Sequence, residues 1–127
     1  MQAHAGGETV GISWIEHKGK RILFEDYSGL VGDEMLEVLY ASEVEFKKQT
    51  SPILVLLDFT DSHVNQKFMD ELKRLGKEYD ALIEKSASAG VTGFKRALAV
   101  AYNLYTGQGH KNPYFDSLEE AKDWLCE

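Results

Sequence analysis

Cysteine, long apolar runs and an excess of positive charge are all scarce or missing in this chain of 127 residues. Its single cysteine, Cys126, excludes an internal disulfide framework and any metal site built from several cysteines. The longest uninterrupted apolar run, 97–102, is far shorter than the ~20 residues that a membrane-spanning helix needs. Fourteen basic residues against 21 acidic ones give a net charge of -7, which argues against a general affinity for nucleic acid or anionic membranes.

What is present is typical of one soluble globular domain. Hydrophobic residues make up 43% and charged residues 28%, and two prolines are too few for an extended or disordered chain. Residues 1–9 are small, polar and aperiodic, so we expect a flexible leader followed by a single domain over 10–127. The leader has no apolar segment of the kind found in signal peptides. We therefore expect a reduced, cytoplasmic protein that does not insert into membranes.

Hydrophobic periodicity predicts an α/β fold. Apolar and polar residues alternate over 10–17, which indicates a half-buried strand, and a Lys-Gly-Lys turn then leads into a second strand. The apolar run 53–57 has no alternation, as is typical of a strand covered on both faces. The predicted strands are 10–17, 21–26, 53–57 and 86–91, the predicted helices are 33–49, 65–84, 94–105 and 117–125, and a polar loop is predicted over 106–113.

The order of these elements predicts a small mixed, mostly parallel sheet with an N-terminal hairpin and helices packed on it. After the hairpin, strands and helices alternate, so the last three strands should pair in parallel through crossover connections. The helix over 65–84 has the clearest apolar stripe, which we expect to face the core. Ser117 and Glu120 have the spacing of a capping box, which marks the start of the final helix.

The chain resembles the SpoIIAA-like family of STAS-type folds (sulfate transporter and anti-sigma-factor antagonist). The resemblance rests on four segments in this order: ILFEDYSG (22–29), VLLDFT (55–60), GVTGFK (90–95) and YFDSLEEAKDWL (114–125). It implies the same α/β fold. Similar folds act as phosphorylation-switched binding partners or, in lipid-carrier relatives, hold an apolar ligand, so both roles are expectations for this chain.

The segment after the third predicted strand departs from the antagonist pattern. Antagonists of this kind carry an Asp-Ser-Ser-Gly turn with a phosphorylated serine, whereas this chain has DFTDSHVN over 58–65. A phosphate on Ser62 would meet the N-terminus of the next helix, but Asp58 and Asp61 would repel it. We expect 58–65 to form a surface recognition loop whose shape, and not its phosphorylation, decides partner binding. The loop residues of interest are Asp58, Thr60, Asp61, Ser62 and His63.

Polar residues follow three strands that should end at the same edge of the sheet. Together with the 58–65 loop, this predicted polar rim consists of Asp26, Ser28, Thr92 and Gly93. Asp26 and Asp58 could hold a magnesium ion or act as an acid/base pair. Short polar residues after strands more often cap helices or close turns, and we favour that interpretation. We therefore expect no catalytic residue, no metal site and no cofactor.

Two further patterns have simpler explanations. Asp61, Ser62 and His63 are adjacent in sequence, so their side chains diverge and do not form a catalytic triad. The glycines of 90–93 stand before two basic residues, but a tight turn explains them better than a phosphate site does.

Three functions remain in order of preference. The first is a non-enzymatic, STAS-like interaction or regulatory module with a protein partner, and a homodimer is compatible with its aromatic residues. The second is a carrier or sensor of a small apolar ligand or lipid, and the third is a phosphate-handling enzyme. An enclosed apolar cavity would favour the second function, and a flat exposed patch near 58–64 would favour the first.

Overall fold

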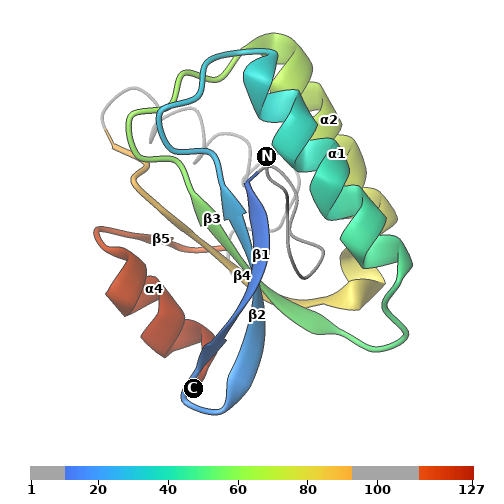
Figure 1. Ribbon diagram of the computed structural model, residues 1–127, viewed down its shortest axis with the longest axis vertical. Helices are drawn as coiled ribbons and strands as arrows, with labels where there is room; N and C mark the ends of the chain where they lie inside the picture. Colours follow the sequence, from blue (N-terminus) through green and yellow to red (C-terminus); the bar gives the residue numbers. More distant parts are fainter. Residues whose placement is uncertain (1–10, 93–111) are drawn as a thin grey trace, which may run out of the picture.

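A computed structural model describes residues 11–92 and 112–127 of the chain, which contain one five-stranded sheet (Figure 1). The strands lie in the order β1-β2-β3-β4-β5. Their bounds are β1 Ile12–His17, β2 Lys20–Asp26, β3 Ile53–Asp58, β4 Ile83–Ala89 and β5 Tyr114–Phe115. β1 and β2 pair antiparallel, and every later pair is parallel. The N-terminal hairpin and the parallel order predicted from the sequence are therefore confirmed.

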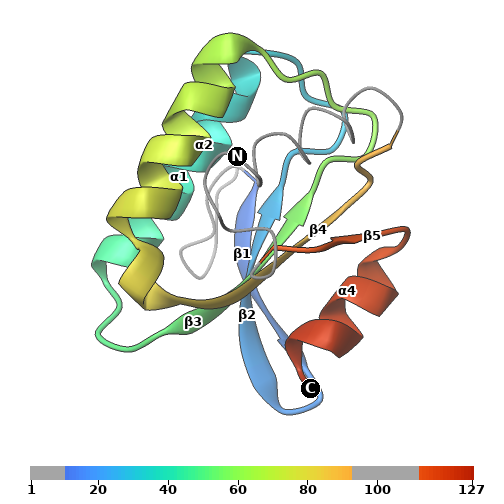
Figure 2. The same ribbon diagram turned by 180° about the vertical axis from the view of Figure 1, so that it is seen from behind.

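Helices cover both faces of this sheet. α1 (Glu34–Lys47) and α2 (Gln66–Glu78) lie side by side on one face, and α4 (Leu118–Leu125) lies on the other (Figures 1 and 2). Asn65 caps α2, because its side-chain oxygen accepts a hydrogen bond from the Phe68 N–H at 2.9 Å. Ser117 begins α4 as its cap, as predicted, because its hydroxyl oxygen accepts from the Glu120 N–H at 3.1 Å; the same hydroxyl donates to Oε1 of Glu120 at 3.2 Å.

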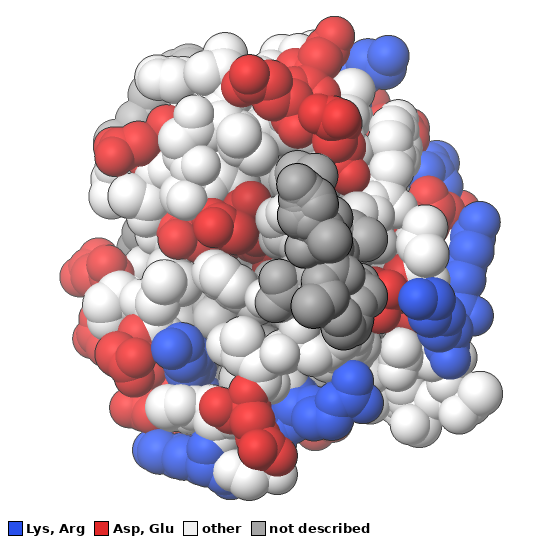
Figure 3. All heavy atoms as spheres, viewed as in Figure 1, with Lys and Arg blue, Asp and Glu red and all other residues white. Residues whose placement is uncertain are grey.

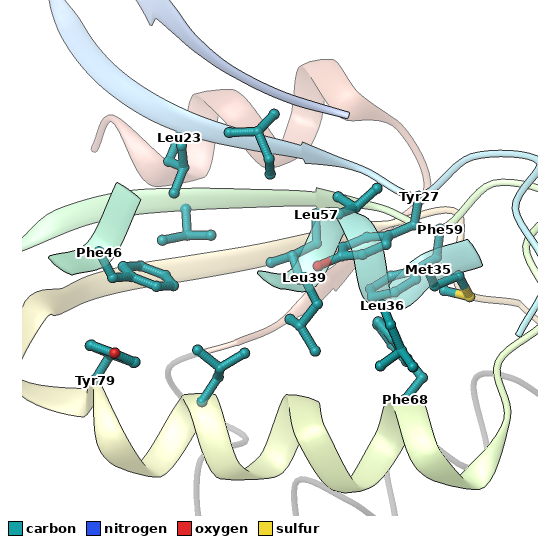
Figure 4. Packing of buried hydrophobic residues seen from close by; sticks show 14 of the residues in the cluster. Leu23, Tyr27, Met35, Leu36, Leu39, Phe46, Leu57, Phe59, Phe68 and Tyr79 are labelled. Carbon is teal, nitrogen blue, oxygen red and sulfur yellow. The ribbon is translucent and has the colours of Figure 1, made fainter. Parts of the chain in front are cut away.

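The core has two layers because β3 is apolar on both sides. Val55 and Leu57 face α1 and α2, whereas Leu54 and Leu56 face α4. The layer beneath α1 and α2 is the larger and contains a group of aromatic rings (Figure 4). Apolar residues are continuous over 53–57 because this strand is buried on both faces, as predicted.

The structure differs from the sequence prediction at two places after α2. The helix predicted over 65–84 ends at Glu78, a short 3-10 helix covers Asp80–Leu82, and β4 begins at Ile83. Ile83 pairs with Ile53 in the sheet, so strand pairing ends the helical pattern earlier than local periodicity indicates. β5 was not predicted, because two residues are too few to show a period.

Some predictions fall outside the described residues. These are the leader over 1–9, the helix over 94–105 and nearly all of the loop over 106–113. Among the residues that the structure describes, no helix is both long enough and apolar enough to cross a membrane.

Candidate functional site

The two aspartates at the ends of β2 and β3 lie next to each other in the parallel register. Oδ1 of Asp26 accepts hydrogen bonds from the N–H and the hydroxyl of Ser28, at 3.0 and 2.6 Å. Oδ1 of Asp58 accepts the same two bonds from Thr60, at 3.0 and 2.7 Å. Each carboxylate therefore closes its own turn, which confirms the turn interpretation of both residues.

Backbone hydrogen bonds hold the two turns against each other and against the end of β4. The Tyr27 N–H donates to the Asp58 carbonyl at 2.9 Å, and the Phe59 N–H donates to the Ala89 carbonyl at 2.8 Å. Gly90 follows with a φ of 77°, and a β-carbon there would lie 2.5 Å from the backbone nitrogen of Thr60. This edge of the sheet is therefore closely packed, and its polar groups hydrogen-bond to one another.

The predicted recognition loop divides into exposed and buried residues. Thr60, Asp61 and His63 are exposed, as expected of a surface loop. Ser62 is 1% exposed and Asp58 is 7% exposed, so the prediction of a surface position is wrong for these two. Ser62 turns inward after the left-handed residue Asp61 (φ 55°), and its hydroxyl donates to the Phe59 carbonyl at 2.8 Å.

The remaining predicted rim residues differ in their exposure. Thr92 and Ser28 are exposed, Asp26 is half-buried, and Gly93 lies outside the described residues. Within 11–92 and 112–127, no group of three or more His, Cys, Asp or Glu side chains could hold a metal ion.

A buried carboxyl that the sequence analysis did not single out lies in the larger core layer. Glu25 of β2 is 2% exposed, and its Oε1 accepts a hydrogen bond from the Tyr27 hydroxyl at 2.6 Å. Burial raises the pKa of Glu25 to about 7, against a smaller lowering by the Tyr27 hydrogen bond. Burial and the adjacent Glu25 also raise the pKa of Tyr27. The sequence does contain a signal for this burial: Glu25 alternates with Leu23 and Tyr27, so it shares the inward face of its strand.

Glu25 lines a cavity of about 110 Å³ between the sheet and helices α1 and α2. The walls are mostly apolar, and Tyr27 projects into the same layer from the end of β2 (Figure 4). Among the apolar lining residues are Leu39 and Phe46 of α1, Leu57 of β3, and Phe68 and Leu72 of α2.

Polar side chains on the sheet form the floor of this cavity. Glu25, Leu57 and Ser88 occupy neighbouring positions on β2, β3 and β4, so the carboxyl and the hydroxyl lie on either side of Leu57. The Ser88 hydroxyl donates to Oδ1 of Asn112 at 3.3 Å. A mostly apolar cavity with a few convergent polar groups is the usual form of a small-molecule site.

Comparison with known proteins identifies the fold. No protein-family model matches the chain, and no curated protein matches it. Among solved structures it is similar to an uncharacterized protein of the DUF3478 family with a SpoIIAA-like fold, from Shewanella loihica PV-4. The sequence identity is 19% and the TM-score is 0.70, over 91% of this chain and 92% of that one. The chain thus has a SpoIIAA-like fold, as its sequence segments predicted.

Proposed function

We propose that this protein is a non-enzymatic binding module that holds a small, mainly apolar ligand in the cavity beneath α1 and α2. The observation that carries the proposal is the cavity itself, which contains a buried carboxyl among mostly apolar walls. This is the second of the functions expected from the sequence, and a mostly apolar cavity favours it over the first.

The size of the cavity limits the ligand. An apolar cavity of about 150 Å³ in another protein binds benzene. This cavity of about 110 Å³ is partly open, so it suits a single aromatic ring with a short substituent, part of which can extend toward the opening. A long lipid chain would not fit without rearrangement of the core.

The chemistry of the carboxylates supports a binding role over a catalytic one. In Asp26 and in Asp58, one carboxylate oxygen accepts the hydrogen bonds that close a turn. Glu25 is the only carboxyl among the described residues that line the cavity, so a paired acid and base are not brought together there. We further propose a cytoplasmic location, with which the free thiol of Cys126 is compatible.

Benzene and toluene are suitable probes for the cavity. We expect either to raise the melting temperature and to shift the NMR signals of residues such as Leu39 and Leu57. Leu72→Phe adds volume at the cavity wall and should abolish both effects, whereas Val44→Phe, at an exposed position of α1, should preserve them. The proposal fails if neither probe binds, or if Leu72→Phe folds and binds both as the wild type does.

A second candidate function, docking of a protein partner at the sheet edge, is favoured by one exposed apolar side chain. Val31 is 53% exposed and forms a β-bridge with His63 of the 58–65 loop. Val44 is also 53% exposed but lies on α1, which makes it a matched control. Binding of a partner at this edge should be lost in the Val31→Ser variant and retained in the Val44→Ser variant. Equal retention by both variants would exclude the edge as the docking site.

A further inference from the structure

We propose that the cavity selects a small apolar amine, whose ammonium group pairs with the carboxylate of Glu25. This inference rests on the proposed function, because it names the ligand class of the same cavity. It follows from the unused bonding capacity of Glu25, from the lack of a basic residue in the described lining, and from the charge of the whole molecule.

The carboxyl of Glu25 has bonding capacity that the described residues leave unused. A carboxylate offers about four lone-pair positions, and Oε1 uses one of them for the Tyr27 hydroxyl. No described residue donates a hydrogen bond to Oε2 or forms an ion pair with Glu25. A carboxyl that is 2% exposed has almost no access to water, and since Glu25 lines the cavity, a ligand there can supply a donor to Oε2.

The described lining of the cavity offers Glu25 no counter-ion. Of the described residues that line the cavity, none is basic. An isolated buried carboxylate costs several kcal/mol, and a cation placed against it in an apolar enclosure offsets much of that cost. With a pKa of about 7, Glu25 needs little free energy to become ionised near neutral pH, so the cation can come from the ligand.

Ligands of other charge suit this cavity less well. A carboxylate ligand would place a second negative charge beside Glu25, where nothing in the described lining compensates it. A neutral alcohol could donate one hydrogen bond but would leave the charge of Glu25 unpaired. The net charge of -7 also favours cations, and on the face in Figure 3 acidic side chains cover the upper and left parts while basic ones lie along the right and lower edges.

Benzylamine, benzyl alcohol and benzoate form a matched set of probes, because they share one ring and differ in the charge of the attached group. We expect calorimetry at about pH 8 to show benzylamine binding at least about tenfold more tightly than benzyl alcohol, with benzoate weaker than both. Glu25→Gln keeps the shape of the side chain and removes its charge. It should weaken benzylamine at least about tenfold and change benzyl alcohol by less than about threefold.

Glu37→Gln is the control for the overall charge, because Glu37 is exposed on α1. It should leave benzylamine affinity unchanged, and an equal loss in both variants would overturn the inference. If Glu25→Gln does not fold, the carboxyl-carbon NMR signal of Glu25 in the wild type serves instead. Benzylamine should shift that signal, and binding without such a shift would overturn the inference.

The two proposals fail in different ways. If benzyl alcohol binds and benzylamine binds no more tightly, the amine inference is wrong and the proposed function stands. If benzyl alcohol, benzylamine, benzene and toluene all fail to bind, both are wrong.

Discussion

The aromatic rings of Tyr27 and Phe59 stack, with centroids 5.1 Å apart and planes inclined by 6°. Each ring is the central residue of an Asp-aromatic-Ser/Thr tripeptide that closes a turn at the end of its strand. Phe68 of α2 meets the Tyr27 ring edge-on at 5.2 Å. The stacked pair therefore links the strand-end turns to the core, and the Tyr27 hydroxyl continues that link to Glu25.

The first prediction concerns pH. Burial raises the pKa of Glu25 from 4.5 to about 7 in the folded protein, so the folded state retains this proton where the unfolded state has lost it. The contribution of Glu25 to the unfolding free energy is fully present below about pH 4.5 and is lost as the pH rises through about 7. The loss amounts to about 3 kcal/mol.

Comparison with Glu25→Gln isolates this contribution. Glu43 and Glu71 titrate in the opposite sense, because hydrogen bonds from Arg74 lower their pKa values. In urea denaturation from about pH 5 to about pH 8, the wild type should lose about 2.5 kcal/mol relative to Glu25→Gln. Glu37→Gln should show no such trend. Parallel stability curves for the wild type and Glu25→Gln would show that Glu25 is not buried as described.

The second prediction concerns the Tyr27 hydroxyl. Its hydrogen bond lowers the pKa of Glu25, so Tyr27→Phe should move that pKa above 7. The same change removes the only donor that a described residue offers to Glu25, and should cost about 1–3 kcal/mol of stability. Carboxyl-carbon NMR measures the pKa directly. Tyr40→Phe, which loses a hydroxyl bonded to the half-buried Glu71 on α2, should leave the Glu25 pKa unchanged.

The third prediction separates steric from conformational cost at two glycines. Gly90 and Gly29 have similar φ values, 77° and 73°, but only a β-carbon at Gly90 would strike the turn at Thr60. Gly29→Ala should cost about 1–2 kcal/mol, from the left-handed backbone alone. Gly90→Ala should cost clearly more, because the Thr60 backbone must move. Equal losses in thermal unfolding would contradict the close approach between β4 and this turn.

The fourth prediction tests the buried position of Ser62. Ser62→Ala should cost about 1 kcal/mol, the usual value of one hydrogen bond, because the hydroxyl donates to Phe59. Ser62→Glu would bury an unpaired charge and should destabilise the protein by several kcal/mol. His63→Glu places the same charge on an exposed neighbour and should have little effect. A stable Ser62→Glu protein would restore the surface role predicted for this serine.

Much of the fold could be predicted from the sequence, because strand and helix periods are local. Three signals each depend on a few neighbouring residues: the alternation in the first strand of the hairpin, the unbroken apolar run 53–57 and the cap at Ser117. All three are found where they were expected. The parallel order followed from the alternation of strands and helices after the hairpin.

Only the tertiary structure decided which polar residues are buried. In the sequence, Glu25 is an acidic residue in a strand and Ser62 is a serine in a polar loop. The neighbouring residues do not by themselves establish that either side chain is buried. Glu25 is buried because β2 lies between β1 and β3 beneath α1, and Ser62 because its loop turns inward at Asp61. Contacts between residues far apart in the chain also end α2 at Glu78 and create β5. Burial and pKa depend on what surrounds a side chain in three dimensions, and the chain acquires those surroundings only when it folds.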